Sequence, residues 1–311
     1  DNYIGNLPFE LQMVLIPGDL VDNGWSYSQW SNTFFTPAHP LFAHVPVYPV
    51  LGNHESDTDY YFKYFHLPET GTPGYEEHWW FTDYSNLRVV GLDSNPGYQL
   101  DVQLDWLEEV LDEACYRTNI DFVFAQLHHP YKSELWLAGE TDYTGEVISR
   151  MEAFTEECKK PSIHFFGHTH GYSRGQSRDH EHLWVNVATA GGNIDYWGEY
   201  SQADYPEFTV SQDEWGFVMV EVQAGDDPGL IEGSIAKTFA RGGLAIGKTE
   251  FYRRAYLSLV AIGLSQPDAT PGDFGSIAMI ELSLRIETLY CFLRGKSKTK
   301  GTLVDQGGKG S

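Results

Sequence analysis

Four short clusters of metal-binding residue types each follow an apolar segment of this chain. They are Gly18-Asp19, Gly52-Asn53-His54-Glu55, His128-His129-Pro130 and Gly167-His168-Thr169-His170. Aspartate, asparagine and histidine supply the oxygen and nitrogen ligands that Fe, Mn, Zn and Co bind in proteins. Because open α/β sheets bind their ligands at the carboxyl ends of strands, four clusters in such positions can meet at one point. Together they predict a metal-dependent active site.

The first two clusters offer both metal ligands and acid–base groups. The carboxylate of Asp19 has two oxygens and can bridge two cations. Asn53 supplies a neutral carbonyl ligand, and His54 can act as a general acid or as a cation for phosphate. Asp22 follows three residues after Asp19, where it can hydrogen-bond a neighbouring imidazole. Taken alone, each of these two clusters also fits an ordinary turn.

The two histidine clusters point to metal binding more directly. Histidine is the commonest side-chain ligand for transition metals. His128 lies nearer its strand than His129, so we expect His128 to be a ligand and His129 to lie behind it or at the surface. His168 and His170 would point to opposite sides of an extended segment, so both can bind only where two metal ions flank the turn. The other seven histidines are expected to be structural or exposed: His39, His44, His66, His78, His164, His180 and His182.

Alternating strands and helices are expected to position these clusters. Apolar periodicity predicts its clearest helix at 102–115, with Leu104, Leu107, Leu111 and Ala114 on one face. Further helices are expected at 26–35, 57–66 and 147–158. Strands are expected at 11–16, 47–51, 79–84, 87–92, 122–127, 163–166, 183–188 and 217–222. This alternation predicts an α/β sandwich with a mixed sheet.

Composition limits the class of protein. Of the 311 residues, 41% are apolar, which excludes a disordered chain and allows a buried core. No apolar run reaches eighteen residues, so we expect no membrane span. The formal net charge of −24 opposes contact with nucleic-acid phosphates. The three cysteines lie far apart, and we expect them to form neither a thiolate metal site nor a disulfide framework.

The chain changes character near residue 224. Residues 1–223 carry a formal charge of −26 and hold all twelve histidines and all nine tryptophans, whereas residues 224–311 carry +2. The later segment offers one strand candidate, at 280–286, before a Gly/Lys/Ser-rich end. We expect one domain at 1–223 and a tail at 224–311 that does not belong to it. A small appended domain is the alternative.

In their order and spacing, the four clusters resemble the motifs of the calcineurin-like metallophosphoesterase superfamily, which includes purple acid phosphatases and the phosphoprotein phosphatases. The family pattern runs D-x-H, G-D-x-x-D, G-N-H-E/D, a lone H and G-H-x-H, and the last four motifs occur here between Gly18 and His170. The resemblance implies an α/β (α+β) fold, a four-layer αββα sandwich with mixed β-sheets that holds two metal ions. The stretch from His128 to Tyr131 is also similar to the H-x-P segment of purple acid phosphatases.

Carried over residue by residue, the resemblance assigns a role to each candidate. The implied metal ligands are Asp19, Asn53, His128, His168 and His170. Asp19 would bridge the two ions, and His170 would bind a different ion from the other three. His54 is similar to the family's catalytic histidine, which protonates the leaving oxygen or binds phosphate, and Asp22 would orient it. Purple acid phosphatases carry a tyrosine where Asp22 stands, so their iron–tyrosinate site should be absent.

The first family motif, D-x-H, has no match in this chain. Asp1-Asn2-Tyr3 is the only candidate in the right place, and its third residue is wrong. We therefore expect the motif to precede Asp1 and the domain to be truncated at its N-terminus. The metal ion held by Asp19 and His170 would then lack two ligands. The start without a methionine or leader also leaves the compartment undetermined. The usual location of superfamily members and the aromatic-rich loops favour an exported protein, periplasmic or extracellular.

The resemblance implies a binuclear metal-dependent phosphoric ester hydrolase. Two divalent or trivalent ions (Fe, Mn, Zn or Co) would hold a bridging hydroxide that attacks a phosphomonoester or phosphodiester. The implied substrate is small and phosphorylated, and loops at 131–143 and 191–205 would select it. Four aromatic residues there are expected to form ring platforms or ordinary packing: Trp136, Tyr143, Tyr196 and Trp197. Two alternatives remain, a catalytically impaired fragment or metal-binding relative, and a nuclease of the same superfamily, which the acidity disfavours.

Overall fold

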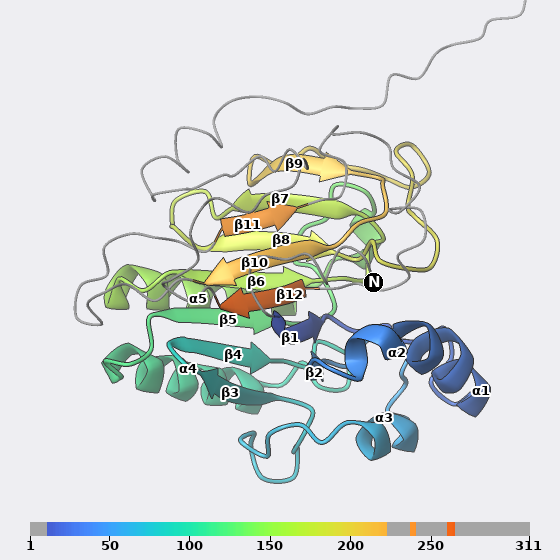
Figure 1. Cartoon of the computed structure of the whole chain (residues 1–311). Coiled ribbons are helices and arrows are strands. Elements are labelled where there is room, and N and C mark those ends of the chain that lie inside the picture. The colour runs from blue at the N-terminus through green and yellow to red at the C-terminus, as the bar shows by residue number, and fades with distance from the viewer. Residues whose placement is uncertain (1–10, 223–236, 241–259, 265–311) are drawn as a thin grey trace, which may run out of the picture.

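Two β-sheets packed face to face form the centre of the protein, as the computed structural model in Figure 1 shows. The structure describes residues 11–222, 237–240 and 260–264. The first sheet contains β1 (Leu11–Ile16), β2 (Val47–Pro49), β10 (Val218–Val222), β11 (Lys237–Ala240) and β12 (Val260–Leu264). Its strand order is β11-β10-β12-β1-β2, with β1 parallel to β2 and antiparallel to β12.

The second sheet contains the other seven strands of the described residues. They are β3 (Trp80–Tyr84), β4 (Leu87–Gly91), β5 (Phe122–Gln126), β6 (Ser162–Phe166), β7 (Tyr172–Gln176), β8 (Leu183–Val187) and β9 (Phe208–Gln212). The order is β3-β4-β5-β6-β8-β7-β9, in which β4, β5, β6 and β8 are parallel neighbours and β3, β7 and β9 pair antiparallel. Both sheets are mixed, which confirms the predicted fold class.

Alternate side chains of the second sheet face two different cores. In β5, Phe122 and Phe124 pack between the two sheets, whereas Val123 and Ala125 pack against helices on the opposite face. Successive strand residues point to opposite faces of a sheet. Both faces are apolar because both are covered, which explains why this strand reads as a continuous apolar run.

Two long helices cover the outer face of the second sheet (Figure 1). They are α4 (Asp101–Tyr116) and α5 (Asp142–Cys158). The predicted apolar face of α4 is buried, including Leu104, Leu107 and Leu111. Each helix joins two neighbouring parallel strands, α4 between β4 and β5 and α5 between β5 and β6. The two helices therefore run in the same direction.

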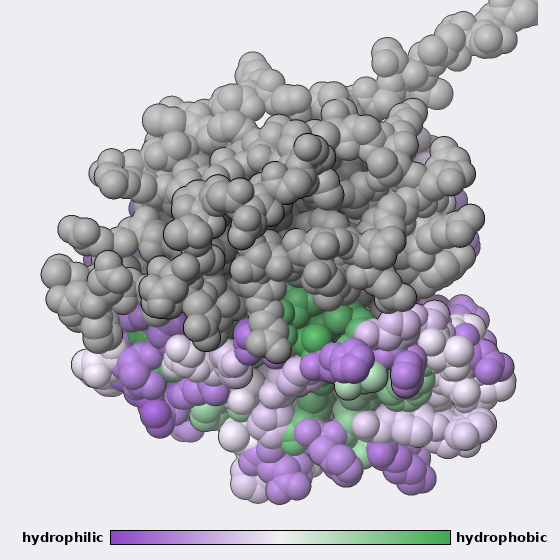
Figure 2. Space-filling model, viewed as in Figure 1, coloured by the Kyte–Doolittle hydropathy of each residue, from purple (hydrophilic) through white to green (hydrophobic). Residues whose placement is uncertain are grey.

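A second group of helices lies near the β2 edge of the first sheet (Figure 1). It contains α1 (Tyr27–Gln29), a π-helical segment η2 (Trp30–Phe35), α2 (Thr36–Phe42) and α3 (Asp59–Tyr64). Thr58 caps α3 by accepting a hydrogen bond from the Tyr60 N–H. Figure 2, in the same view, shows an apolar area at the middle of the described face and hydrophilic residues around its lower rim.

Two segments beyond residue 224 take part in the first sheet. Strand β12 pairs with β1 on one side and with β10 on the other, and β11 pairs with β10. Part of the segment expected to be a separate tail thus adds strands to this sheet. The predicted domain boundary at residue 223 remains a prediction. The strand expected at 280–286 lies outside the described residues. Within the described ranges, no helix combines the length and apolar character that a membrane span needs.

The expectation that the cysteines form no disulfide was wrong, because Cys115 and Cys158 are joined by a disulfide bond with a Cα–Cα distance of 5.3 Å. Cys115 lies near the end of α4, and Cys158 is the last residue of α5. Since the two helices run in the same direction on the same face of the sheet, their C-terminal ends meet. A sequence separation of 43 residues gives no hint of this contact.

We predict that reduction of this disulfide destabilises the protein. A disulfide limits the conformations of the unfolded chain, and its loss typically costs about 2–4 kcal/mol of unfolding free energy. Dithiothreitol should lower the melting temperature of the wild-type protein. The double variant Cys115→Ser/Cys158→Ser should melt at that lower temperature with or without the reductant. Equal melting temperatures of reduced and oxidised wild-type protein would contradict the prediction.

Candidate metal centre

The carboxyl ends of four strands carry the candidate ligands to one edge of the sandwich. Asp19 follows β1 and Asn53 follows β2, and these two strands are parallel. His128 follows β5 and His168 follows β6, which are also parallel neighbours. Parallel strands bring their carboxyl ends to the same edge, so the tertiary structure places the four side chains together.

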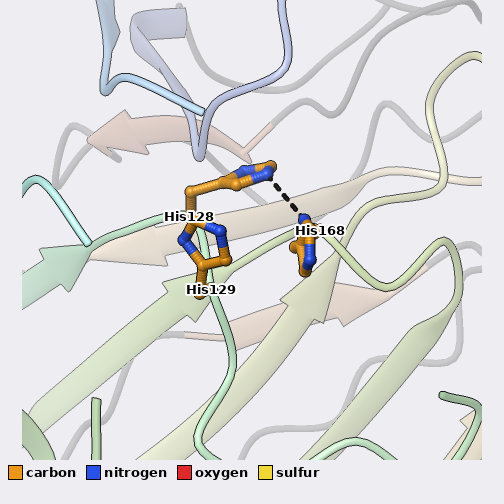
Figure 3. A group of neighbouring side chains, drawn as sticks. All are labelled: His128, His129 and His168. Atoms are coloured by element: carbon orange, nitrogen blue, oxygen red, sulfur yellow. Dashed lines mark hydrogen bonds between the residues drawn. The ribbon is translucent and has the colours of Figure 1, made fainter. Parts of the chain in front are cut away.

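The imidazole of His128 lies at the centre of these residues. Its Nε2 atom is 3.1 Å from Asp19 Oδ2, 3.0 Å from Asn53 Oδ1 and 3.2 Å from His168 Nδ1. Figure 3 shows the His128 ring directed toward the His168 ring, with His129 beside both. His128 is buried. The structure thus brings four of the five predicted metal ligands into direct contact.

Hydrogen bonding shows that a cation fits this group. The Nδ1–H of His128 can donate to the carbonyl oxygen of Pro17, 2.8 Å away. In the neutral tautomer, Nε2 then carries a lone pair that faces the oxygens of Asp19 and Asn53, which are acceptors as well. Atoms with lone pairs repel one another unless a proton or a cation lies among them. Oxygen and imidazole nitrogen form the ligand set that Fe, Mn, Zn and Co accept.

The ionisation of Asp19 and His168 favours the same conclusion, whereas the pKa of His128 is raised and a metal ion would have to displace its proton. Burial opposes the charge of Asp19, but His128 and His54 outweigh it and hold the pKa of this carboxyl below its usual value. Burial also opposes a charge on His128, and the Asp19 carboxylate outweighs that effect and raises the pKa of His128. Burial, His128 and His129 together lower the pKa of His168. Asp19 is therefore an anion and His168 a neutral imidazole at neutral pH, the forms that bind metal ions.

A buried carboxylate that sequence reasoning missed joins two of the ligand loops. The Glu55 side chain accepts hydrogen bonds from the backbone N–H groups of Gly52 (2.7 Å) and Asp19 (2.9 Å). It also accepts from Leu20 at 2.7 Å and from Val21 at 3.3 Å. Burial and the nearby Asp19 charge raise the pKa of Glu55 to about 7. Glu55 completes the G-N-H-E motif, which was the one available sequence signal.

Backbone geometry at the ligands is unusual. Asp19 and His168 have φ angles of 55° and 64°, in the left-handed region that few non-glycine residues adopt. A Cβ atom on Gly52 would overlap Asp19 Oδ1, so only glycine allows the two loops to approach this closely. Such strained residues cluster at functional sites, where the surrounding structure holds them in place.

His129 is buried beside the ligands rather than exposed. The Ser94 hydroxyl accepts the N–H groups of His128 (3.1 Å) and His129 (2.8 Å) and lies 2.9 Å from His129 Nδ1. The His129 and His168 ring centroids are 4.4 Å apart. Burial and then His128 lower the pKa of His129 to about 3, so it is neutral. His128, His129 and His168 lie close enough together to hold a metal ion, which makes His129 a further candidate ligand.

His170 points toward a different partner. The backbone N–H of His170 donates to Asp195 Oδ2 at 2.7 Å, and the ring Nδ1 of His170 lies 3.6 Å from Asp195 Oδ1. Metal-binding histidines commonly direct one nitrogen at a carboxylate, which orients the other nitrogen toward the ion. Asp195 is buried and was not identified from the sequence. The geometry is compatible with the predicted second metal position, which stays a prediction.

His54 and Asp22 lie at the exposed side of the centre. His54 Nδ1 is 2.7 Å from the backbone carbonyl oxygen of Asp22 and 3.8 Å from its carboxylate. His54 Nε2 lies 3.9 Å from Asp19 Oδ2. Asp22 can therefore orient His54 as predicted, but the closer contact comes from its main chain.

The histidines outside the four clusters have other environments. His164 and His182 are buried, with His164 Nδ1 and His182 Nε2 2.9 Å apart. His78 Nδ1 donates to the buried Asp93 at 2.8 Å, and with Asp57 this pair is close enough to hold a cation. Hydrogen bonds from His78 and Asn95 already use both Asp93 oxygens, so we interpret this pair as structural. The remaining four are exposed or partly exposed: His39, His44, His66 and His180.

We predict that Glu55→Gln weakens both the fold and metal binding. Each Glu55 oxygen accepts two N–H groups, so an amide NH₂ in place of one oxygen would leave buried N–H donors unpaired. The expected loss in unfolding free energy is about 1–3 kcal/mol per unsatisfied group, measured by urea denaturation. Metal affinity from isothermal titration calorimetry should fall as well. Lys63→Gln, which affects an exposed pair on α3, should change neither quantity. Unchanged stability of Glu55→Gln would contradict this interpretation.

Comparison with solved structures shows the same fold in a larger protein. The purple acid phosphatase PPD1 from yellow lupin (Lupinus luteus) seeds matches with a TM-score of 0.55 and 16% identity, over 86% of this chain and 50% of that chain. GAP50, titled the anchor in the inner membrane complex of Plasmodium, gives a TM-score of 0.41 and 12% identity over 65% of this chain and 68% of its own. PhoD gives a TM-score of 0.37 and 10% identity, over 56% of this chain and 46% of its own. The chain thus spans half the length of the lupin enzyme.

Comparison with family models and with curated proteins gives two results. No curated protein matches the sequence. The family model of the calcineurin-like phosphoesterases matches residues 5–172, a segment that contains all four ligand clusters. Because this match covers more than half of the 311 residues, the chain belongs to the calcineurin-like phosphoesterase family.

Proposed function

We propose that the protein is a binuclear metal-dependent hydrolase of phosphoric esters. The observation that carries this proposal is the convergence of Asp19, Asn53 and His168 on His128 Nε2, at 3.0–3.2 Å. A group of lone pairs that face one another around the buried His128, at the ends of four strands, needs a cation. Membership of a phosphoesterase family supports ester hydrolysis as the reaction that such cations serve.

The residues would divide between two ions, of Fe, Mn, Zn or Co. Asn53, His128 and His168 would hold one ion, Asp19 would contact both, and His170 would hold the other. Bound ions would supply a Lewis acid for the phosphoryl oxygens and lower the pKa of water. His128 is buried beside the His129 and His168 rings, which limits the access of water to it. The left-handed conformations of Asp19 and His168 would fix the ligands before an ion binds.

His54 is suited to give a proton to the leaving oxygen. Its Nδ1–H can donate to the Asp22 carbonyl, which leaves Nε2 as the nitrogen that faces the centre. The side chain is 38% exposed, so a substrate can reach it. A positioned general acid contributes roughly 10²–10⁴-fold to a reaction rate.

The substrate we propose is a small phosphate ester. The formal net charge of −24 opposes binding of a polyanion such as nucleic acid, which disfavours the nuclease alternative. The other alternative is a relative that binds metal without turnover. One observation favours it: the chain has no D-x-H motif, so only Asp19 and His170 are assigned to the second ion.

The proposal is tested by metal-dependent hydrolysis. Protein freed of metal should bind Mn, Zn, Fe or Co in isothermal titration calorimetry and then hydrolyse p-nitrophenyl phosphate or its bis-ester. Metal binding without turnover of either ester would support the metal-binding relative instead. Absence of metal binding would reject both proposals.

We predict different effects for two neighbouring substitutions. His54→Ala should lower kcat by roughly 10²–10⁴-fold, because the general acid is lost. Asp22→Ala should leave most activity, because the backbone carbonyl that contacts His54 is retained and the carboxylate is 85% exposed. Steady-state kinetics with p-nitrophenyl phosphate checks both. A larger loss in Asp22→Ala than in His54→Ala would reject this assignment.

We also propose that the protein folds in an oxidising compartment and is exported. The Cys115–Cys158 disulfide supports this, because reducing compartments rarely retain structural disulfides. Alkylation of the native protein directly after cell lysis should leave Cys115 unmodified until a reductant is added. Immediate alkylation of Cys115 in the folded protein would reject an exported location.

A further inference from the structure

A row of aromatic rings leads from the solvent to the candidate metal centre. The Trp136 ring centroid is 5.1 Å from that of His168, and Tyr200 follows at 5.7 Å from Trp136. The planes are tilted by 34° and 41°, within the range of favourable ring contacts. Trp136 is half-buried and Tyr200 is 43% exposed. The row therefore ends in an open aromatic surface that is two rings away from a proposed metal ligand.

Two loops far apart in the sequence are held together to build this row. The Leu137 N–H donates to the Ser201 carbonyl at 3.1 Å, directly beside Trp136 and Tyr200. The Tyr205 hydroxyl donates to Glu140 at 2.9 Å and fixes the other end of the same pair of loops. A short 3₁₀ turn, η3 (Leu137–Gly139), follows Trp136. These contacts make the Trp136–Tyr200 surface a fixed part of the fold.

Close packing also holds Trp136 against the centre. A Cβ atom on Gly139 would lie 2.9 Å from the Trp136 ring and 3.1 Å from the His168 ring. Only glycine leaves room for both rings at this point. Of the aromatic residues predicted to form platforms, Tyr143 is instead buried in the core beneath α5. Tyr196 is 50% exposed but has no ring contact among the described residues.

The charges near this surface restrict what can bind. Glu199 precedes Tyr200 in the chain. The negative charge of Glu199 is the largest effect that raises the pKa of the Tyr200 hydroxyl, and burial and the charge of Asp195 contribute less. The Glu199 carboxylate accepts the Tyr196 N–H at 3.1 Å, which keeps it in the same loop. A second anionic group would be repelled here, whereas a neutral planar ring would not.

We propose that Trp136 and Tyr200 form a stacking surface for the leaving group of the substrate, a neutral planar ring such as a nucleobase or an aryl group. The phosphate of the same ester would lie at the neighbouring metal centre, so this inference rests on the proposed function. Stacking requires a ring face and no hydrogen-bond pattern, so the surface accepts either kind of ring. It selects ring-bearing esters over aliphatic ones.

The experiment compares three esters on Tyr200→Ala and Trp136→Leu. We expect KM for AMP and for p-nitrophenyl phosphate to rise by about tenfold, the typical loss on removing one stacked ring. KM for β-glycerophosphate, which has no ring, should stay constant, and kcat of Tyr200→Ala should be retained. A rise in KM for AMP alone would identify a nucleobase as the ligand. A rise in KM for p-nitrophenyl phosphate alone would identify an aryl group. An equal rise for all three esters would overturn the proposal.

Tyr196→Ala is the matched control, because Tyr196 is similarly exposed in the same loop but lies outside the row of rings. It should leave all three KM values unchanged. Binding of adenosine in isothermal titration calorimetry is a readout that needs no turnover. Hydrolysis of all three esters by Tyr200→Ala with the same KM values as wild type would overturn this inference alone. The protein could instead bind adenosine without hydrolysing any ester. If Tyr200→Ala abolishes that binding, the proposed function is rejected and the ring surface is retained.

Discussion

The candidate metal centre depends on one buried carboxylate, that of Glu55. Its two oxygens accept four backbone N–H groups, three from the loop after β1 and one from the loop after β2. These loops carry Asp19 and Asn53. Without such an acceptor, these N–H groups, including that of Asp19 in its left-handed conformation, would be unpaired inside the protein. A carboxyl group inside the protein is thus used to position the Asp19 carboxylate.

The same arrangement explains why the centre is suited to cations. Asp19 and Glu55 place two carboxylates beside a buried imidazole, and the His128 Nδ1 proton is committed to the Pro17 carbonyl. The remaining lone pairs of His128, Asn53 and His168 face one another. The Trp136 ring continues this packing outward, so the candidate ligands and the open aromatic surface are parts of a single structure.

Most elements could be predicted from the sequence, and the misses have physical causes. Apolar runs such as 122–126 predict buried strands because both faces of the second sheet are covered. The short strands β7 and β9 were not predicted, because each is largely polar and is defined by its antiparallel partners. The helical segment predicted at 26–35 continues through α2, although Pro37 lies in the first turn of α2 and Pro40 lies in its interior, where proline normally ends a helix.

By itself the sequence determined the family, the candidate ligands Asp19, Asn53, His128, His168 and His170, and the candidate general acid His54, because metal ligands at strand ends have fixed chemistry and order along the chain. Only the tertiary structure revealed four other features: the buried hydrogen bonds of Glu55, the carboxylate of Asp195 beside His170, the Cys115–Cys158 disulfide and the contact of Trp136 with Tyr200. Each joins residues from separate segments of the chain. Such pairs depend on how strands and helices pack, and no local pattern of residue types records that packing.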